Sequence, residues 1–284
     1  MMQSLVRPVI LIAIGASATL LVFAIALSWY GAWDDERKGY TADISDGYCN
    51  IAVIPIQGDI VAYENIYEDP TDEGSSYPYV STTGDWVVGY LRAAEADPGV
   101  GGILVTVDSY GGQASPALEI MDALESSPLP VIAYIREAGT SAAYLSVLGA
   151  DHIVGNPFAS VGSIGVTYSY LDQSEKNARE GIRYVQLSSG PYKDAGSPDK
   201  PLTESERALF ERDIATYKDV FVDLVAEHRD IPKEKVVTLA DGDAWPAPLA
   251  LERGLIDAVG NMETVRRLFA NELGIGEEDV ALCN

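Results

Sequence analysis

The longest apolar stretch of the chain lies near its N-terminus. Residues 8–33 contain no charged side chain, and residues 9–30 are almost wholly apolar. At about 1.5 Å per residue, a helix of this length crosses about 30 Å of hydrocarbon. The pattern therefore predicts a transmembrane helix over 9–30 after a short tail over 1–8. A cleavable signal peptide is the alternative, with small residues at 24 and 26, but its apolar core usually has only about 7–15 residues.

Beyond a polar tether over 31–49, short apolar runs alternate with amphipathic stretches. The alternation predicts an α/β fold with a largely parallel sheet, because strands buried on both faces are continuously apolar and the intervening helices cover them. The strand candidates are 50–56, 102–107, 130–135, 151–154, 162–168 and 183–187, and the main helix candidates are 85–96, 115–124, 248–253 and 263–273.

A long helix is predicted from Thr203, which forms a capping box with Glu206. Its apolar positions step by four and three residues, so one stripe packs while the other faces remain in water. These positions are Phe210, Ile214, Tyr217, Phe221 and Leu224. Residues 50–272 suffice for one domain with a core, and residues 273–284 are expected to form a C-terminal tail.

The charge balance narrows the choice of partners. The chain has 43 acidic and 19 basic residues, a net charge of −24, which argues against a nucleic-acid partner. A salt-rich habitat is one hypothesis for so acidic a surface. Cys49 and Cys283 have no metal-ligand spacing, and they form either one disulfide outside the cytoplasm or two free thiols. No metal or nucleotide motif is present, so no cofactor is expected.

Two turns have the residue types that acyl-transfer chemistry requires. Ser141 follows a buried strand candidate and enters a helix, where free backbone N–H groups favour negative charge and small neighbours leave room for a substrate. The alternative is a helix-capping hydroxyl. Gly111 and Gly112 follow another strand candidate and can expose backbone N–H groups to an oxyanion, although an ordinary Gly-Gly turn has the same sequence.

The base that a serine nucleophile needs is not an obvious histidine. His152 lies in an apolar strand candidate and His228 near the end of the long helix. A lysine can serve instead if it is desolvated enough to be neutral. Lys193, between Tyr192 and a Gly-Ser-Pro turn, suits this role. Other lysines have acidic or exposed settings, namely Lys200, Lys218, Lys233 and Lys235.

Four ordered motifs carry a resemblance to a known family. They are Asp-Ser-Tyr-Gly-Gly at 108–112, Thr-Ser-Ala-Ala-Tyr at 140–144, Gly-Ser-Ile-Gly-Val at 162–166 and Ser-Gly-Pro-Tyr-Lys-Asp-Ala-Gly-Ser-Pro at 189–198. Over roughly residues 50–270 the chain resembles the signal peptide peptidase SppA family, membrane-anchored Ser–Lys serine proteases. The resemblance implies a ClpP/crotonase-like α/β fold for the domain.

The resemblance also implies residue roles. Ser141 would attack the scissile carbonyl, Lys193 would take its proton, and Ser163 would orient the lysine. The N–H groups of Gly112 and Ala142 would hold the oxyanion.

The resemblance further implies a location and partners. A single-pass anchor would hold the catalytic domain on the extracytoplasmic side of the cell membrane. Ring or dome oligomers, in which serine and lysine come from neighbouring protomers, would bind remnant signal peptides in extended form.

Three alternatives remain open at this point. A Ser–Lys protease of the same fold could trim a specific membrane-protein partner. A crotonase-like acyl-CoA enzyme shares the Gly-Gly oxyanion logic. A membrane-tethered scaffold with a lapsed dyad is suggested by Tyr110, Ala142 and Ala143, where the family usually has a proline and glycines.

Overall fold

A central sheet organises the described part of the chain. The computed structural model describes residues 44–45, 47–63 and 80–283. The strands described there are β1 (Ile51–Val61), β2 (Ser81–Thr83), β3 (Gly102–Gly112), β4 (Val131–Thr140), β5 (His152–Gly155), β6 (Ser160–Gly162), β7 (Ala244–Pro246), β8 (Ala258–Val259) and β9 (Leu282–Cys283). Their order is β2-β1-β3-β4-β5-β8, with β9 beside β1 and β6 between β4 and β7. Every pairing is parallel except β6 with β7, as the alternating pattern predicts.

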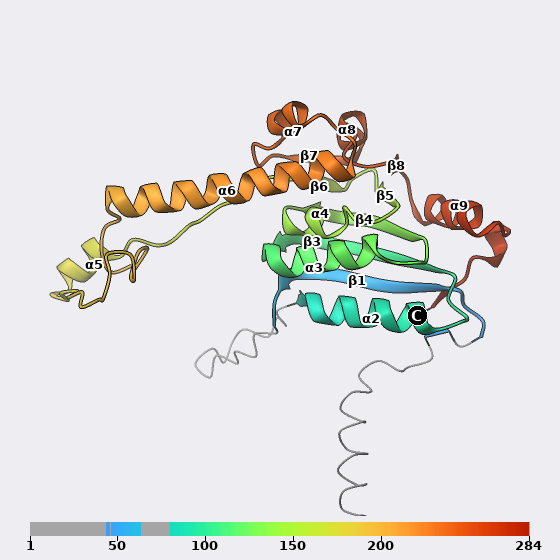
Figure 1. The fold of residues 1–284 in the computed structure, drawn as a ribbon, viewed down its shortest axis with the longest axis horizontal. Coiled ribbons are helices and arrows are strands. Elements are labelled where there is room, and N and C mark those ends of the chain that lie inside the picture. The colour runs from blue at the N-terminus through green and yellow to red at the C-terminus, as the bar shows by residue number, and fades with distance from the viewer. Residues whose placement is uncertain (1–43, 46, 64–79, 284) are drawn as a thin grey trace, which may run out of the picture. The chain divides into compact units, whose positions relative to one another are not determined.

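Helices cover both faces of this sheet (Figure 1). The described helices are α2 (Gly84–Ala96), α3 (Ala114–Glu125), α4 (Ala142–Ser146), α5 (Ser174–Arg179), α6 (Glu204–His228), α7 (Lys233–Leu239), α8 (Ala247–Arg253), α9 (Met262–Leu273) and the 3-10 turn Glu277–Asp279. Successive strand residues alternate between two cores: Ile103 and Val105 face α2 and α3, whereas Leu104 faces α9. Burial on both faces explains why the central strands are continuously apolar.

Helix α6 is long enough to extend beyond the sheet, and the segment that precedes it projects from the domain together with its first half. We call residues 168–210 the arm; it includes α5 and the start of α6 (Figure 1). The predicted capping box of Thr203 with Glu206 is present. Of the stripe predicted along α6, Phe221 is buried in the core, whereas Tyr217 is 62% exposed. The C-terminal half of the helix therefore packs against the core of the domain, whereas Phe210 in its first half stacks on Tyr168 of the arm.

Three expectations from the sequence need correction. The strand expected at 162–168 ends at Gly162, and residues 183–187 form no strand. Val185 and Leu187 are 64% and 94% exposed, because an alternating apolar pattern makes a strand only where a neighbouring strand is available. The segment expected as a tail over 273–284 instead contributes β9, which pairs with the beginning of β1.

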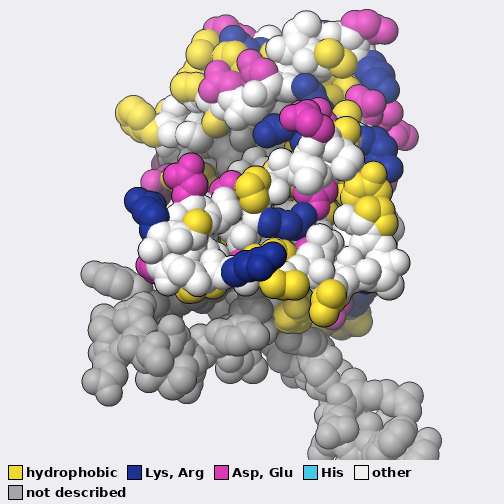
Figure 2. All heavy atoms as spheres, turned by 90° about the vertical axis from the view of Figure 1, so that its left-hand side faces the viewer, with side chains coloured by type: hydrophobic (Ala, Val, Ile, Leu, Met, Phe, Trp, Pro, Cys, Tyr) yellow, Lys and Arg dark blue, Asp and Glu magenta, His cyan; other side chains and the backbone are white. Residues whose placement is uncertain are grey.

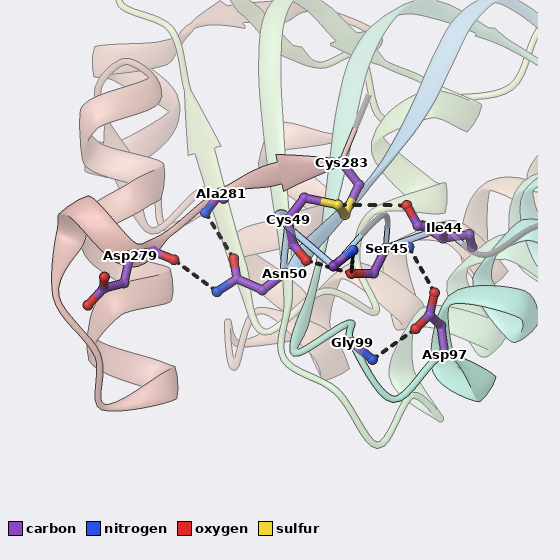
Figure 3. The surroundings of a disulfide bond; sticks show 10 residues. Ile44, Ser45, Cys49, Asn50, Asp97, Gly99, Asp279, Ala281 and Cys283 are labelled. Carbon is purple, nitrogen blue, oxygen red and sulfur yellow. Dashed lines mark hydrogen bonds between the residues drawn. A yellow bond between two sulfur atoms is a disulfide. The ribbon is translucent and has the colours of Figure 1, made fainter.

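A disulfide fastens this C-terminal strand. Cys49 and Cys283 are bonded, with their Cα atoms 5.1 Å apart, so the pairing alternative holds. Beside it, Asn50 donates to the Asp279 carbonyl at 2.9 Å and accepts from the Ala281 N–H at 2.9 Å (Figure 3). The two ends of the described domain are thus joined at the start of β1.

No helix in the described ranges is long and apolar enough to cross a membrane. The span predicted at 9–30 lies outside these ranges.

Candidate active site

Ser141 occupies a strained turn between β4 and α4. Its backbone has φ 53° and ψ −126°, one of three positive φ values among the described non-glycine residues, with Ser163 and Asp230. Such a conformation costs about 1–3 kcal/mol and persists only where the surroundings enforce it. Here the Ser141 N–H donates to the Gly162 carbonyl at 2.7 Å, and its carbonyl accepts from Leu145 N–H at 3.0 Å. A sharp strand-to-helix turn of this kind presents a serine hydroxyl outward.

The Gly-Gly turn at the end of β3 lies directly against Ser141. Gly111 and Gly112 have φ 119° and 146°. A Cβ on Gly111 would lie 2.9 Å from the Ser141 Cβ, and one on Gly112 would lie 2.2 Å from the Ile60 carbonyl oxygen. Only glycine fits at either position. The amide of Ala142 begins α4 and has no acceptor within that helix, so backbone donors lie on both sides of the serine.

Ser163, directly after β6, also has a positive φ and donates its N–H to a backbone carbonyl. Its φ is 50°, its N–H donates to the Asp243 carbonyl at 2.8 Å, and its hydroxyl donates to the Gly242 carbonyl at 3.0 Å. Because the hydroxyl uses its proton there, the lone pairs of its oxygen remain available to a second donor. The loop before β7 thereby fixes this serine.

These residues share one groove of about 980 Å³. Its walls come from the end of β3, from α3, α4 and α6, and from the segments after β6 and before β7. The lining is mostly apolar apart from backbone donors, hydroxyls and the charged residues Lys218 and Asp241. It comprises Gly112, Ala114, Ser115, Leu118, Ser141, Ala142, Leu145, Ser163, Gly165, Val166, Thr167, Ile214, Tyr217, Lys218, Val220, Phe221, Leu224, Ala240, Asp241 and Gly242. The groove thus contains four of the five residues predicted for the site: Ser141, Ser163, Gly112 and Ala142.

Lys193, the fifth, is not among the groove residues of its own chain. It lies in the turn 191–196 of the arm, with its side chain exposed. In Figure 1 the arm extends along α6 away from the sheet. Figure 2 views the molecule from that side and shows hydrophobic, acidic and basic side chains mixed on its face. Within one chain, the predicted nucleophile and base are not brought together.

A polar network nevertheless gives the Lys193 turn a defined structure. Asp194 accepts hydrogen bonds from the Tyr184 hydroxyl at 2.8 Å and from Gln186 at 2.5 Å. Lys200 pairs with Glu206, which is only 2% exposed. The hydrogen bond between them raises the pKa of Lys200 and lowers that of Glu206. Lys200 is therefore held as a cation.

Neither histidine lies in the groove. His152 Nε2 is 3.2 Å from Glu272 at the other face of the sheet. His228 Nδ1 is 2.9 Å from the Leu224 carbonyl, and its Nε2 has no hydrogen-bond partner. Over the described ranges, no cluster of three or more His, Cys, Asp or Glu side chains is arranged to hold a metal ion. The groove offers a serine with backbone donors and no histidine base.

Comparison with known proteins decides the family. The model of peptidase family S49 matches residues 123–276, more than half of the 284 residues. The chain belongs to this family. Relatives named as signal peptide peptidase SppA and as Protease 4 agree with the family that the motifs predict.

Named relatives agree with this assignment. A protein of Methanocaldococcus jannaschii named as a protease is 32% identical over 201 residues, covering 70% of this chain and 64% of that protein. A protein of Enterococcus faecium named as a signal peptide peptidase SppA is 30% identical over 176 residues, covering 61% and 51%. The chain thus spans about half to two thirds of these relatives.

A solved structure shows the fold. A mutant of the 1510-N membrane-bound stomatin-specific protease superposes with a TM-score of 0.52 at 17% identity, covering 83% of this chain and 93% of that chain. At this identity the likeness concerns the fold alone. It confirms the class of the expected ClpP/crotonase-like domain, an α/β fold with a largely parallel sheet.

Sequence reasoning missed two charged residues of the groove. The sequence pattern groups Lys218 with the lysines in acidic or exposed settings, and it assigns Asp241 no role. Both line the groove. The available signal was position: Lys218 lies four residues after Ile214 and three before Phe221, within the apolar stripe of α6.

Proposed function

We propose that this chain is a serine endopeptidase in which Ser141 attacks peptides bound in the groove. The strained backbone of Ser141, at the groove wall between the donors of Gly112 and Ala142, is the observation that carries the proposal. Strain of this kind concentrates at functional sites, and donors beside a serine suit the charge of a tetrahedral intermediate. The mostly apolar lining suits an extended apolar peptide.

In the proposed reaction, the neutral amine of Lys193 takes the Ser141 hydroxyl proton while Oγ attacks the carbonyl carbon. The N–H groups of Gly112 and Ala142 hold the oxyanion. The protonated amine then gives its proton to the leaving nitrogen, and water hydrolyses the acyl-enzyme by the same route. Ser163 Oγ, with its lone pairs available, would accept from the amine and orient it.

We propose that Lys193 comes from a second copy of the chain in a homo-oligomer. The exposed position of Lys193 outside its own groove supports this arrangement. Exposed apolar side chains of the arm, at Leu171, Ile182, Val185 and Leu187, offer a surface that a neighbour would cover.

The proposed location is the extracytoplasmic side of the cell membrane, with residues 9–30 as a single-pass anchor. The uncharged run of the sequence supports the anchor, and the Cys49–Cys283 disulfide supports an oxidising compartment. The proposed substrates are remnant signal peptides or other membrane-associated peptides. The name of the stomatin-specific relative favours a second candidate, trimming of one membrane-protein partner.

The test compares the full-length chain in detergent with Ser141→Ala and Lys193→Ala on a library of apolar peptides. We expect both variants to lose cleavage, because each removes one half of the dyad. Ser115→Ala and Lys176→Ala are matched controls, since the first removes another groove hydroxyl and the second another lysine of the arm.

Mixing the two inactive variants tests the shared site. If neighbours exchange arms, about a quarter of the sites regain an intact serine and lysine after random mixing of equal amounts. No recovery in the mixture would overturn the second-copy arrangement. Equal turnover by parent, Ser141→Ala and Lys193→Ala would overturn the peptidase itself and favour a scaffold with a lapsed dyad.

A further inference from the structure

Two charged side chains interrupt the uncharged lining of the groove. Lys218 comes from the middle of α6, and Asp241 from the loop before β7. Asp241 has a structural partner, because its Oδ1 accepts the Asp243 N–H at 3.0 Å. This bond supports the loop that holds Ser163. The side chain of Lys218 has no ion pair or hydrogen bond within the part of the chain that the structure describes.

The helix itself offers Lys218 no carboxylate partner. Residues three and four positions away on a helix are neighbours, and around Lys218 all four are apolar. They are Ile214, Ala215, Phe221 and Val222. The adjacent Asp219 lies about 100° around the helix from Lys218. The next acidic residues, Asp213 and Asp223, are each five positions away and pair with Arg212 and Lys233. Although the chain has 43 acidic residues, none of those described forms an ion pair with Lys218.

Lys218 also occupies a fixed place relative to the nucleophile. One turn after it, Phe221 and Val222 are 6% and 1% exposed, so α6 is anchored in the core at this point. Lys218 itself is half-buried. A rigid helix therefore places Lys218 in the lining of the groove that contains Ser141.

We propose that Lys218 binds a carboxylate of the peptide substrate, so that the groove selects peptides with an acidic group beside an apolar segment. The inference rests on the proposed peptidase function. An unpaired ammonium gains a charge-assisted hydrogen bond from a carboxylate, and it repels a basic side chain at the same subsite. The carboxylate belongs either to an Asp or Glu side chain or to a free C-terminus.

The test measures binding separately from cleavage. Labelled apolar peptides with Asp, Asn or Lys at one scanned position, each with a free or an amidated C-terminus, are titrated against full-length Ser141→Ala in detergent. At one scanned position, or at the free C-terminus, the carboxylate should tighten binding roughly ten- to a hundredfold. Adding Lys218→Glu should remove this preference and favour Lys peptides. Lys235→Glu, on an exposed lysine of α7, should leave it unchanged.

Each outcome bears on the proposal. Loss of tight binding on Asp→Asn identifies a side-chain carboxylate, and loss on amidation identifies the C-terminus. Equal affinity for acidic, neutral and basic peptides, or an unchanged profile in Lys218→Glu, would overturn the carboxylate subsite. Cleavage of the same peptides by the parent chain is measured in parallel. Charge-selective binding without any cleavage would overturn the peptidase function and leave the subsite standing.

Discussion

The position of the disulfide in the chain predicts how much its removal lowers the free energy of unfolding. Cys49 precedes β1 and Cys283 ends β9, so the bond closes a sequence separation of 234 residues. Replacing both cysteines in a Cys49→Ser, Cys283→Ser variant removes that constraint from the unfolded chain. The pairing of β1 with β9 and the Asn50 hydrogen bonds remain to hold the folded C-terminal segment (Figure 3).

The magnitude follows from the length of the closed loop. The chain-entropy relation gives about 5 kcal/mol for this separation, and measured losses are usually about 2–4 kcal/mol. We therefore expect the variant to unfold with a free energy lower by about 2–5 kcal/mol. With a urea dependence near 2–3 kcal/mol per molar, the midpoint should fall by about 1–2 M. The urea midpoint is measured by tryptophan fluorescence of the full-length chain in detergent.

Reduction provides the control for this experiment. A reductant should lower the midpoint of the parent and leave the double variant unchanged. Peptidase turnover under native conditions should survive, because the bond lies at the start of the parallel strands and Ser141 at their end. An unchanged midpoint in the double variant would refute the reasoning, as would a shift when that variant is reduced.

Two further predictions concern the site and the arm. Gly112→Ala should lower kcat/KM at least about a hundredfold, because its Cβ would lie 2.2 Å from the Ile60 carbonyl oxygen. Gly101→Ala, whose Cβ would meet nothing nearer than the Leu273 side chain at 3.6 Å, should keep near-parent kcat/KM; equal values for both would contradict the oxyanion role. The lowered pKa of Glu206 means that its pairing with Lys200 stabilises the arm above the usual glutamate pKa and fades as pH falls through the folded value. The hydrogen-exchange protection factors of residues 184–200, taken relative to the intrinsic exchange rate at each pH, should therefore fall between pH 5 and pH 3 more in the parent than in Glu206→Gln. An equal fall in both would count against this role.

The apolar pattern predicted the central sheet because burial on both faces leaves a direct mark on the sequence. The runs that became β1, β3 and β4 are continuously apolar, and the stripes that became α2 and α3 lie between them. The same reasoning placed a strand at 183–187, where the pattern is right but none of the strands in the described residues lies alongside. The local pattern indicates which face of a segment can be buried. Whether a neighbouring strand is available for pairing depends on the tertiary structure.

The site divides in the same manner. Ser141 and the Gly-Gly turn could be placed from the sequence, since they follow apolar strand candidates whose ends meet at one edge of a parallel sheet. Ser163 was expected at the site only from the family resemblance, because the strand candidate 162–168 contained it. The position of Lys218 in the groove could not be predicted, because a lysine on a helix is expected to be exposed unless the segments that pack against that helix are known.

By itself, the sequence determined the α/β class, the order of the main elements and the family, because these depend on local pattern and on residue identity at ordered motifs. Only the tertiary structure decided the strain at Ser141, the pairing of Cys49 with Cys283 and the separation of Lys193 from its own groove. These depend on distances between segments remote along the chain. Such distances are set by packing, and no short stretch of sequence encodes them.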